Sequence, residues 1–353
     1  MSRPLNICYL LESTELSGGV RVVLDQVRAL TDRGHTVTVL AQRGNVAWYP
    51  YPVTLHYVED FAAAATALKP HVDVVIATFW TTVAPALACS AALTVHLCQG
   101  LEWECPEYGN IAEQIEAAYR HPIPKLTVGP WLDEKLQHRY GATTFPIACI
   151  GQCVDTRLYH PPSTLQDWMR RWRRKTPHLL VPGLFESWVK GIDIALQAVE
   201  RLRNEGRILH LTRVSSLPQN ALESGITAID SYHQAITPAR MAQLYQQADI
   251  VLTPSYDAEG FGLPFAEALA SGTAVVATAI PSYLSLNDRH DYARFVPKGN
   301  SAALATAVAS LLDNPGERVR MGRRGAALLR GRYGANDVAM RLEKVLHGWL
   351  GHE

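Results

Sequence analysis

The chain has 353 residues, of which 48% are apolar, and its formal net charge at pH 7 is zero. This length exceeds what one hydrophobic core usually supports, so two domains are expected. The balanced charge argues against a nucleic-acid-binding protein, and no apolar run approaches the about 18 residues of a membrane-spanning helix. The six cysteines form no CxxC pair and the start of the chain lacks a signal-peptide pattern. We therefore expect a cytoplasmic protein with free thiols and no metal site.

Strand-like and helix-like segments alternate through the first half of the chain. The segment 19–33 has the apolar spacing of an amphipathic helix, and Gly34 follows it as a left-handed cap. Six apolar runs are predicted to be strands: Asn6–Leu11, Thr36–Gln42, Val53–Val58, Asp73–Phe79, Leu93–Cys98 and Leu126–Val128.

A second alternating series begins near His178. Helices are predicted at 191–206 and 237–248, the second with Thr237 as N-cap and Pro238 at its first position. Continuously apolar strands between helices indicate parallel sheets that are covered on both faces. The predicted strands of this half are 178–183, 207–215, 226–230, 249–255, 273–279 and 293–297. The chain is therefore predicted to hold two doubly wound α/β domains, divided near the prolines at 161 and 162.

The segment DAEGFGLPFAEALASG, residues 257–272, lies between two of these predicted strands. It would form the turn at the carboxyl end of a strand, where open α/β sheets bind ligands, and then a helix that starts near Pro264. Free N–H groups at a helix start favour a phosphate, and glycines let a ligand approach the main chain. Two carboxylates, Glu259 in the loop and Glu267 in the first helical turn, suit paired hydroxyls. The pattern predicts a nucleotide-sugar site.

The same segment resembles the E-x7-E motif of retaining glycosyltransferases of the GT4 type. The resemblance continues, in the order of that family, through five stretches: SGGVRVVLDQVRALTDRGHTVTVL, TVGPWLDEKLQHRYG, VDTRLYHP, VKGIDIALQAVERL and LYQQADIVLTPSYDAEGFGLP. It implies the α/β GT-B fold, in which two Rossmann-like doubly wound parallel-sheet domains face each other across a cleft. Residues 1–160 plus about 335–353 would form the N-terminal acceptor domain, with the C-terminal helix crossing back. Residues 161–334 would form the donor domain.

The resemblance also implies a role for each residue of the motif. Glu259 would contact hydroxyls of the donor sugar, and Glu267 would bind the ribose hydroxyls of the nucleotide. Lys190 would pair with the diphosphate, whose charge grows as the nucleotide leaves. Main-chain contacts to the donor are implied for Gly18, Gly19, Gly260, Phe261, Gly262 and Leu263. The chain contains no D-x-D motif, which agrees with a transferase that retains the anomeric configuration and uses no metal and no cofactor.

The chain departs from the family pattern at two places. Leu184 stands where an arginine usually precedes the lysine, and Arg213, at the end of the next predicted strand, is a candidate for the missing cation. Gln99 stands where many relatives have a histidine, and a glutamine orients groups without titrating. Glu102 and His96 are the other candidates on the acceptor side. For Gln99 and Glu102 packing is the alternative, and for His96 a buried structural role is favoured.

Other functions stay open at this point. A sugar-nucleotide epimerase would also bind a nucleotide sugar, and Leu184 suggests a non-catalytic binder that descended from a transferase. A glycosidase is disfavoured because Glu259 and Glu267 come from one loop-helix unit and would hardly flank a scissile bond. The predicted acceptor is a glycan or a lipid-linked glycan.

The stretch DWMRRWRRK, residues 167–175, places five cations beside two tryptophans that share a helix face. One interpretation is a weak membrane-surface contact through Trp168–Lys175, with the protein peripheral at the inner face of the membrane. The alternative, which we favour, is a helix that packs its tryptophans on the second domain and solvates its arginines.

Overall fold

The computed structural model describes residues 3–68, 71–141, 145–162 and 176–351. The chain forms two compact units, which we call unit 1 (residues 1–153 and 333–353) and unit 2 (residues 154–332). The first predicted boundary, 160, lies seven residues after the observed one, and the second, about 335, lies two residues after it. The predicted membrane contact, Trp168–Lys175, lies outside the described residues.

Unit 1 is built on a parallel seven-stranded sheet with the order β3-β2-β1-β4-β5-β6-β7. Its strands are β1 (Asn6–Ser13), β2 (Thr36–Arg43), β3 (Leu55–Tyr57), β4 (Val74–Ala77), β5 (Leu93–Cys98), β6 (Lys125–Thr127) and β7 (Ile147–Cys149). The strand order reverses between β1 and β4, and such a reversal is where open parallel sheets bind ligands. The helix that follows β1 therefore starts at this position.

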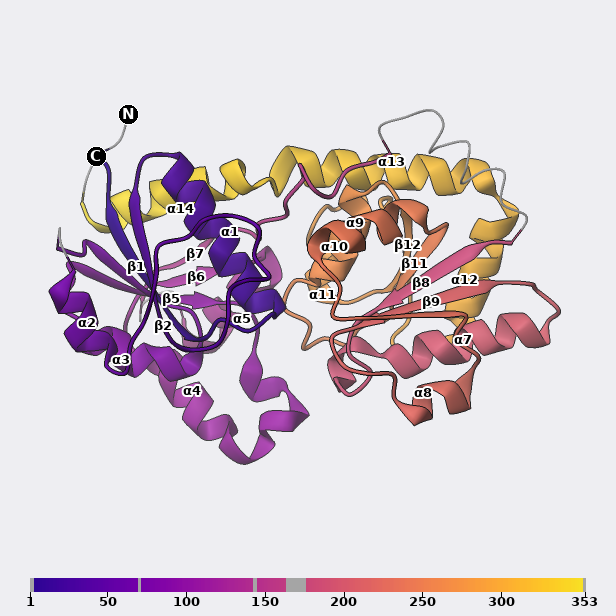
Figure 1. The fold of residues 1–353 in the computed structure, drawn as a ribbon, viewed down its shortest axis with the longest axis horizontal. Coiled ribbons are helices and arrows are strands. Elements are labelled where there is room, and N and C mark those ends of the chain that lie inside the picture. Colours follow the sequence, from indigo (N-terminus) through magenta and orange to yellow (C-terminus); the bar gives the residue numbers. More distant parts are fainter. Residues whose placement is uncertain (1–2, 69–70, 142–144, 163–175, 352–353) are drawn as a thin grey trace. The chain divides into compact units, whose positions relative to one another are not determined.

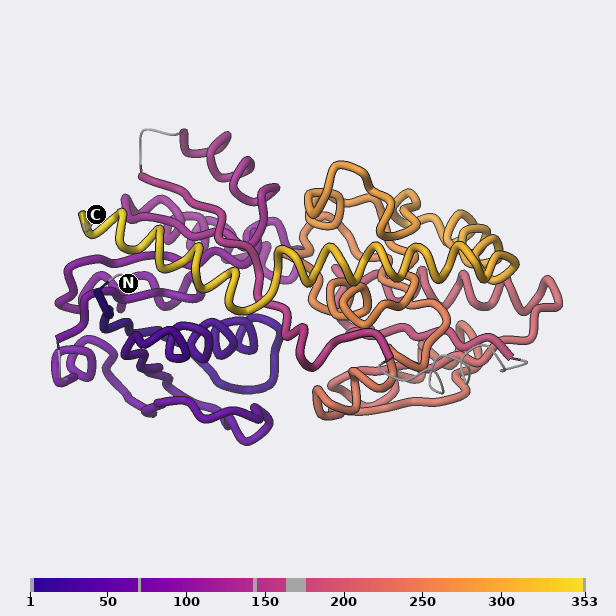
Figure 2. Tube along the Cα trace, turned by 90° about the horizontal axis from the view of Figure 1, so that it is seen from above, coloured from indigo at the N-terminus to yellow at the C-terminus, as the bar shows by residue number. Residues whose placement is uncertain are grey.

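Helices cover both faces of this sheet (Figure 1). They are α1 (Gly18–Asp32), α2 (Phe61–Ala67), η1 (Trp80–Thr82), α3 (Val83–Ala88), η2 (Glu102–Glu104), η3 (Pro106–Ile111), α4 (Ala112–Arg120), α5 (Pro130–Tyr140) and α14 (Ala335–Trp349). Phe61 of α2 and Val83 of α3 pack with β1 and β4 in one core cluster. The C-terminal α14 runs beside α1, as the yellow and indigo tubes of Figure 2 show. Arg33 Nε, just after α1, donates to Glu343 Oε2 of α14 at 2.8 Å.

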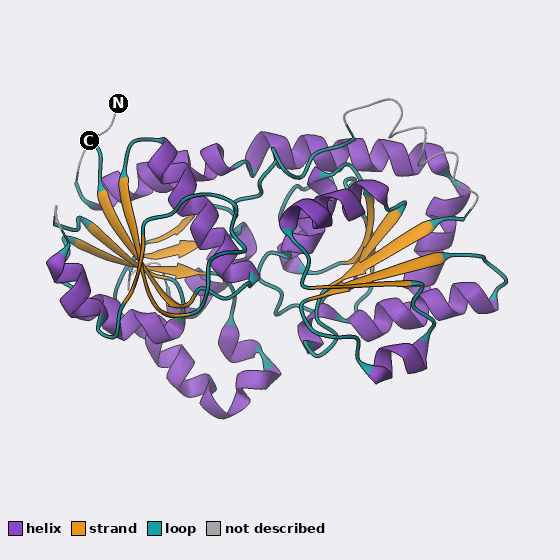
Figure 3. Cartoon of the chain, viewed as in Figure 1, coloured by secondary structure: helices purple, strands orange, loops and turns teal. Residues whose placement is uncertain are grey.

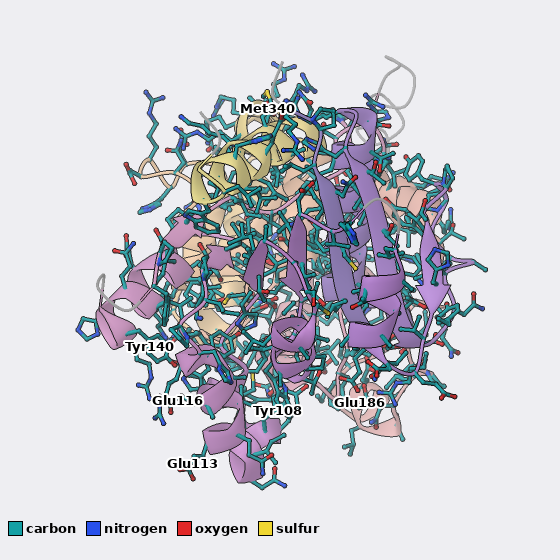
Figure 4. All side chains as sticks on the ribbon, turned by 90° about the vertical axis from the view of Figure 1, so that its left-hand side faces the viewer. Tyr108, Glu113, Glu116, Tyr140, Glu186 and Met340 are labelled. Atoms are coloured by element: carbon teal, nitrogen blue, oxygen red, sulfur yellow. The ribbon has the colours of Figure 1, made fainter. Side chains whose placement is uncertain are left out.

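Several helices of unit 1 carry side chains that reach its surface. Figure 4 shows Tyr108 on η3, Glu113 and Glu116 on α4, and Met340 on α14. Glu116 accepts a hydrogen bond from Arg139 Nε at 2.8 Å, which ties α4 to α5. Met340 is 43% exposed, because it lies on the side of α14 opposite the buried Val338 and Leu342 stripe.

Unit 2 is built on a parallel six-stranded sheet with the order β10-β9-β8-β11-β12-β13 (Figure 3). Its strands are β8 (His178–Pro182), β9 (His210–Ser215), β10 (Ser231–Gln234), β11 (Ile250–Thr253), β12 (Ala274–Thr278) and β13 (Arg294–Val296). Its helices are η4 (Trp188–Lys190), α7 (Ile192–Asn204), α8 (Ala221–Ile226), α9 (Pro238–Gln247), α10 (Leu263–Ala270), α11 (Pro281–Leu284), α12 (Ser301–Asp313) and α13 (Pro315–Arg332).

Close packing fixes α10, the helix of the 257–272 segment. On one face of the sheet, α7 and α12 share a core cluster with β8, β9, β11 and β12. On the other face α13 packs against α10 and its C-terminal turn. A Cβ at Gly322 of α13 would come within 2.1 Å of the Gly272 carbonyl oxygen, and one at Gly325 within 2.8 Å of Leu269. Gly322 therefore allows α13 to approach the C-terminal turn of α10 more closely than any side chain would permit, and a side chain at Gly325 would require Leu269 to move.

The structure confirms two doubly wound parallel sheets and corrects three local predictions. The predicted strand 226–230 is wrong, because Ile226 ends α8 and the strand is the polar Ser231–Gln234. This strand pairs only with β9 at the edge of the sheet, so its apolar content is low. Strand β7 was not predicted, and Glu267 lies beyond the first turn of α10. None of the described helices is long and apolar enough to cross a bilayer.

Candidate functional site

Glu259 and Lys190 meet at the carboxyl ends of two neighbouring strands of unit 2. Strands β8 and β11 are paired, so the loops that follow them emerge at the same edge of the sheet. Lys190 ends η4 in the first loop, and Glu259 lies in the second loop, before α10. Lys190 Nζ donates to Glu259 Oε2 at 2.7 Å, and Glu259 is only 7% exposed. The pair combines a carboxylate acceptor with an ammonium group that has further donors.

Ser255 connects this pair to the rest of the loop. Its hydroxyl lies 3.2 Å from Glu259 Oε2 and accepts a hydrogen bond from Tyr283 Oη at 2.9 Å. The Ser255 carbonyl accepts from the Thr278 hydroxyl. Because Tyr283 is also buried and stacked on Phe265, with ring centroids 4.1 Å apart, the carboxylate of Glu259 is held in a fixed orientation.

A glycine is required just before α10 for a conformational and a steric reason. Gly262 has φ +76°, which is in the left-handed region, and a Cβ there would lie 2.3 Å from Tyr283 Cε1. Phe261 is buried at 4% exposure, whereas Gly260 lies in the loop and Leu263 is half-buried at the start of α10. The bare backbone of this segment is thus required by its own fold at Gly262, apart from any ligand.

Glu267 is buried on α10, and its side chain is oriented by a different residue from those that orient Glu259. Its Oε2 accepts a hydrogen bond from Tyr245 Oη of α9 at 3.1 Å, and it is 5% exposed. Since α10 starts at Leu263, Glu267 lies one turn into the helix rather than in the first turn as predicted. A carboxylate has two oxygens and about four acceptor sites, so its chemistry suits hydroxyl donors.

The assignment of Arg213 to the donor is wrong in this structure. Its guanidinium is 0% exposed and donates to Glu223 Oε2 at 2.6 Å, to the Val181 carbonyl at 2.6 Å and to the Gly183 carbonyl at 3.0 Å. These bonds hold the start of the loop that carries Lys190. Arg213 therefore supports this loop from within the protein and does not replace the cation missing at the half-buried Leu184.

In unit 1, Gly18, Gly19 and Gln99 come together where the strand order reverses. The glycines open α1, whose N-cap Ser17 accepts from Val20 N at 3.3 Å. A Cβ on Gly19 would lie 3.4 Å from the Gln99 amide, which is contact distance, so Gly19 and Gln99 are neighbours. Gln99 Nε2 donates to the Thr78 carbonyl at 3.3 Å, and its buried Oε1 has no partner within the described residues.

His96 is excluded from the acceptor side by its burial. It is 1% exposed in β5, and neither ring nitrogen has a hydrogen-bond partner among the residues that the structure describes. Burial, with the nearby charges of Lys125 and His121, lowers the pKa of His96 to about 3. The prediction that it lines the acceptor region is therefore wrong, and the favoured alternative, a buried structural histidine, agrees with its position.

Glu102 lies at the start of η2 and points toward a buried tyrosine. Tyr119 Oη donates to Glu102 Oε2 at 2.5 Å and to the Gly100 carbonyl at 3.1 Å. Burial of the carboxyl group raises the pKa of Glu102, which the Tyr119 hydrogen bond partly offsets. The residue is half-buried, so the structure leaves both packing and acceptor contact open to it.

Sequence reasoning missed the residues that orient the two glutamates. Ser255 follows β11 with only Pro254 between them, so its place at the carboxyl end of a strand was a usable signal. Tyr245 and Tyr283 come from α9 and α11, and nothing in their local sequence indicates a partner on α10 or its loop. Within the described ranges, no group of three or more His, Cys, Asp and Glu side chains is placed to hold a metal ion.

The sequence of unit 2 matches a known family. Residues 176–314 match the family model described as glycosyl transferases group 1. Among curated proteins, the chain is 30% identical over 226 residues to a D-inositol 3-phosphate glycosyltransferase of Xylanimonas cellulosilytica, covering 60% of this chain and 54% of that protein. The chain thus spans about half the length of the curated relatives it matches.

Solved structures resemble the whole chain in fold. Sucrose-phosphate synthase from Thermosynechococcus elongatus superimposes with a TM-score of 0.82 at 17% identity, covering 99% of this chain and 100% of that one. HepE of Anabaena, in complex with UDP-glucose, gives a TM-score of 0.79 at 14% identity, covering 98% and 100%. At such identities the likeness establishes the fold, which is GT-B.

Proposed function

Residues 176–314 match the glycosyl transferases of group 1, and from this premise we propose that the chain moves a sugar from a nucleotide-diphosphate donor to an acceptor hydroxyl. The observation that carries the proposal is the Glu259–Lys190 pair, with Glu267 one helix turn beyond it, inside the segment that matches the family. The UDP-glucose bound to HepE supports a nucleotide-sugar donor.

In the proposed reaction the bond between the anomeric carbon and the phosphate oxygen breaks. The acceptor oxygen forms the new bond to this carbon and releases its proton to water, and the nucleoside diphosphate leaves with an added negative charge. Lys190 has three N–H donors, of which one serves Glu259, so two are free to offset this charge. We propose retention of the anomeric configuration without a resident metal.

The two glutamates would fix the two ends of the donor. Glu259 would accept hydrogen bonds from hydroxyls of the sugar, and Glu267 would accept them from the ribose. Both side chains are already buried and oriented by neighbours, so little order has to be created when the donor binds. Main-chain groups of Gly260, Phe261 and Gly262 would lie along the diphosphate and sugar.

The acceptor is proposed to be a carbohydrate or lipid-linked hydroxyl compound. The Xylanimonas relative is named for D-inositol 3-phosphate, a ring with several hydroxyls, which supports an acceptor of this chemistry. Gln99 and Glu102 of unit 1 are the proposed contacts to this acceptor. We also propose a cytoplasmic location, and sedimentation with and without anionic liposomes tests the peripheral alternative.

The test is release of nucleoside diphosphate from UDP-glucose, GDP-mannose and ADP-glucose, by the wild type and by Lys190→Ala. Loss of one preorganised charge-stabilising donor should lower kcat by about 10²–10³-fold, whereas Lys344→Ala, an exposed lysine on α14, should change nothing. Isomerised nucleotide sugar without release would identify an epimerase. Binding without release or isomerisation would identify a non-catalytic binder.

A further inference from the structure

An aromatic pair lies beside the Lys190–Glu259 pair. Trp188 and Tyr256 are stacked, with ring centroids 4.6 Å apart and planes 15° from parallel. Tyr256 supports one face of the indole, yet Trp188 stays 48% exposed. A large aromatic surface that is held from one side and open on the other is a preformed contact for a flat ligand.

The backbone beneath this aromatic pair is tightly connected. Tyr256 N donates to the Val189 carbonyl at 2.8 Å, which joins the loop after β8 to the loop after β11. Gly191 has φ +56°, and a Cβ there would come within 2.2 Å of the Pro254 carbonyl oxygen. Because the two loops touch at a position where only glycine fits, the pair has little freedom to shift when a ligand binds.

The surroundings of the pair are polar. Lys298 Nζ donates to Asp257, which follows Tyr256, and both side chains are more than 40% exposed. The backbone of Gly299 lies close to the Tyr256 hydroxyl, since a Cβ there would be 3.5 Å from it. The residues around Tyr256 thus supply a carboxylate, an ammonium group and a hydroxyl next to an aromatic pair. This combination matches a hexose, which presents C–H bonds on its face and hydroxyls at its rim.

We propose that Trp188, supported by Tyr256, is a stacking platform for the hexose ring of the nucleotide-sugar donor. This inference rests on the proposed function. The donor sugar is bonded directly to the phosphate that Lys190 is proposed to hold, so it has to lie next to Lys190, and Trp188 is two residues away. The nucleobase is separated from that phosphate by a ribose and a second phosphate, so it lies further off.

Calorimetric titration tests this proposal with three nucleotides and their sugars: UDP and UDP-glucose, GDP and GDP-mannose, ADP and ADP-glucose. The variants are Trp188→Ala, Trp188→Phe and the control Ile208→Ala, whose side chain is 79% exposed just before the amino end of β9. Trp188→Ala should weaken the nucleotide sugar at least tenfold and the free nucleotide less than twofold. Trp188→Phe should retain most of the affinity, and Ile208→Ala all of it.

Two results would overturn the proposal while the proposed function stands. If Trp188→Ala binds the nucleotide sugar as tightly as the wild type, the indole makes no contact with the donor. If the free nucleotide loses as much affinity as its sugar, the platform serves the nucleobase. A wild type that binds none of the six compounds would end the proposed function, and this inference with it.

Discussion

Arg213→Met is predicted to destabilise unit 2 by about 3–5 kcal/mol, because it leaves the buried carboxylate of Glu223 without a cation. Arg213 is 0% exposed and Glu223 is 1% exposed, so water reaches neither charge. Their 2.6 Å hydrogen bond is accompanied by Arg213 bonds to the Val181 and Gly183 carbonyls.

The double variant Arg213→Met/Glu223→Leu separates the charge from the hydrogen bonds. Removing both charges eliminates the unpaired carboxylate, and apolar replacements of buried pairs are often tolerated. Three carbonyls, those of Val181, Gly183 and Val214, still lose a donor, so we expect the double variant to be about 1–2 kcal/mol less stable than the wild type. Urea denaturation followed by circular dichroism measures these differences, with Glu223→Leu as the second single variant.

Two outcomes would refute this reasoning. A loss below about 1 kcal/mol in Arg213→Met would show that water or another group replaces the cation. A double variant as unstable as the single one would show that the carboxylate is not the source of the loss. Because Arg213 supports the loop rather than the ligand, the double variant should also keep its nucleotide affinity within about threefold, and a hundredfold loss, about 2.7 kcal/mol, would restore Arg213 as a donor contact.

Two further predictions concern backbone and charge. Gly262→Ala should destabilise unit 2 by more than about 1 kcal/mol, because φ is +76° and Tyr283 occupies the position of the new Cβ. The control Gly225→Ala has open space around it and should not be destabilised to this extent. Thermal melts compare the two variants, and equal stability of both would contradict the steric explanation. Burial lowers the pKa of Lys125 from 10.5 to about 8. Between these values the unfolded chain holds a proton that the folded chain has released, so unfolding free energy should rise by up to about 3 kcal/mol from pH 8 to 10.5. Urea titrations at the two pH values should show no such rise in the unfolding free energy of Lys125→Met. A rise equal to that of the wild type would show that Lys125 is not its source.

The sequence was sufficient for the architecture because the strands of both units are buried runs between helices. Strand β8 is buried at all five positions and β12 likewise, so the apolar pattern alone predicts them. The prediction failed at β10, where an edge position allows the polar sequence SYHQ. The prediction also missed β7, a half-buried strand of three residues at one edge of the unit 1 sheet.

For the site, the motif singled out Glu259 and the sequence singled out Lys190, but neither predicted that the two side chains contact each other. Glu259 and Lys190 are 69 positions apart, and only the pairing of β8 with β11 brings them to 2.7 Å. Arg213 was misassigned because the end of a strand does not reveal whether a long side chain turns outward or back into the sheet. His96 sits in an apolar strand, and its burial follows from that context.

Unit 2 is proposed above all to bind a nucleoside diphosphate through Glu267. Thermal stabilisation by UDP, GDP, ADP, CDP and dTDP tests it on the wild type, on Glu267→Ala and on Tyr245→Phe, which removes the same hydrogen bond but keeps the carboxylate. A nucleotide at about 100 times its Kd contributes about 2.7 kcal/mol. We predict that one nucleotide stabilises the wild type and Tyr245→Phe but fails on Glu267→Ala. Equal stabilisation of all three proteins, or of none, would contradict the account.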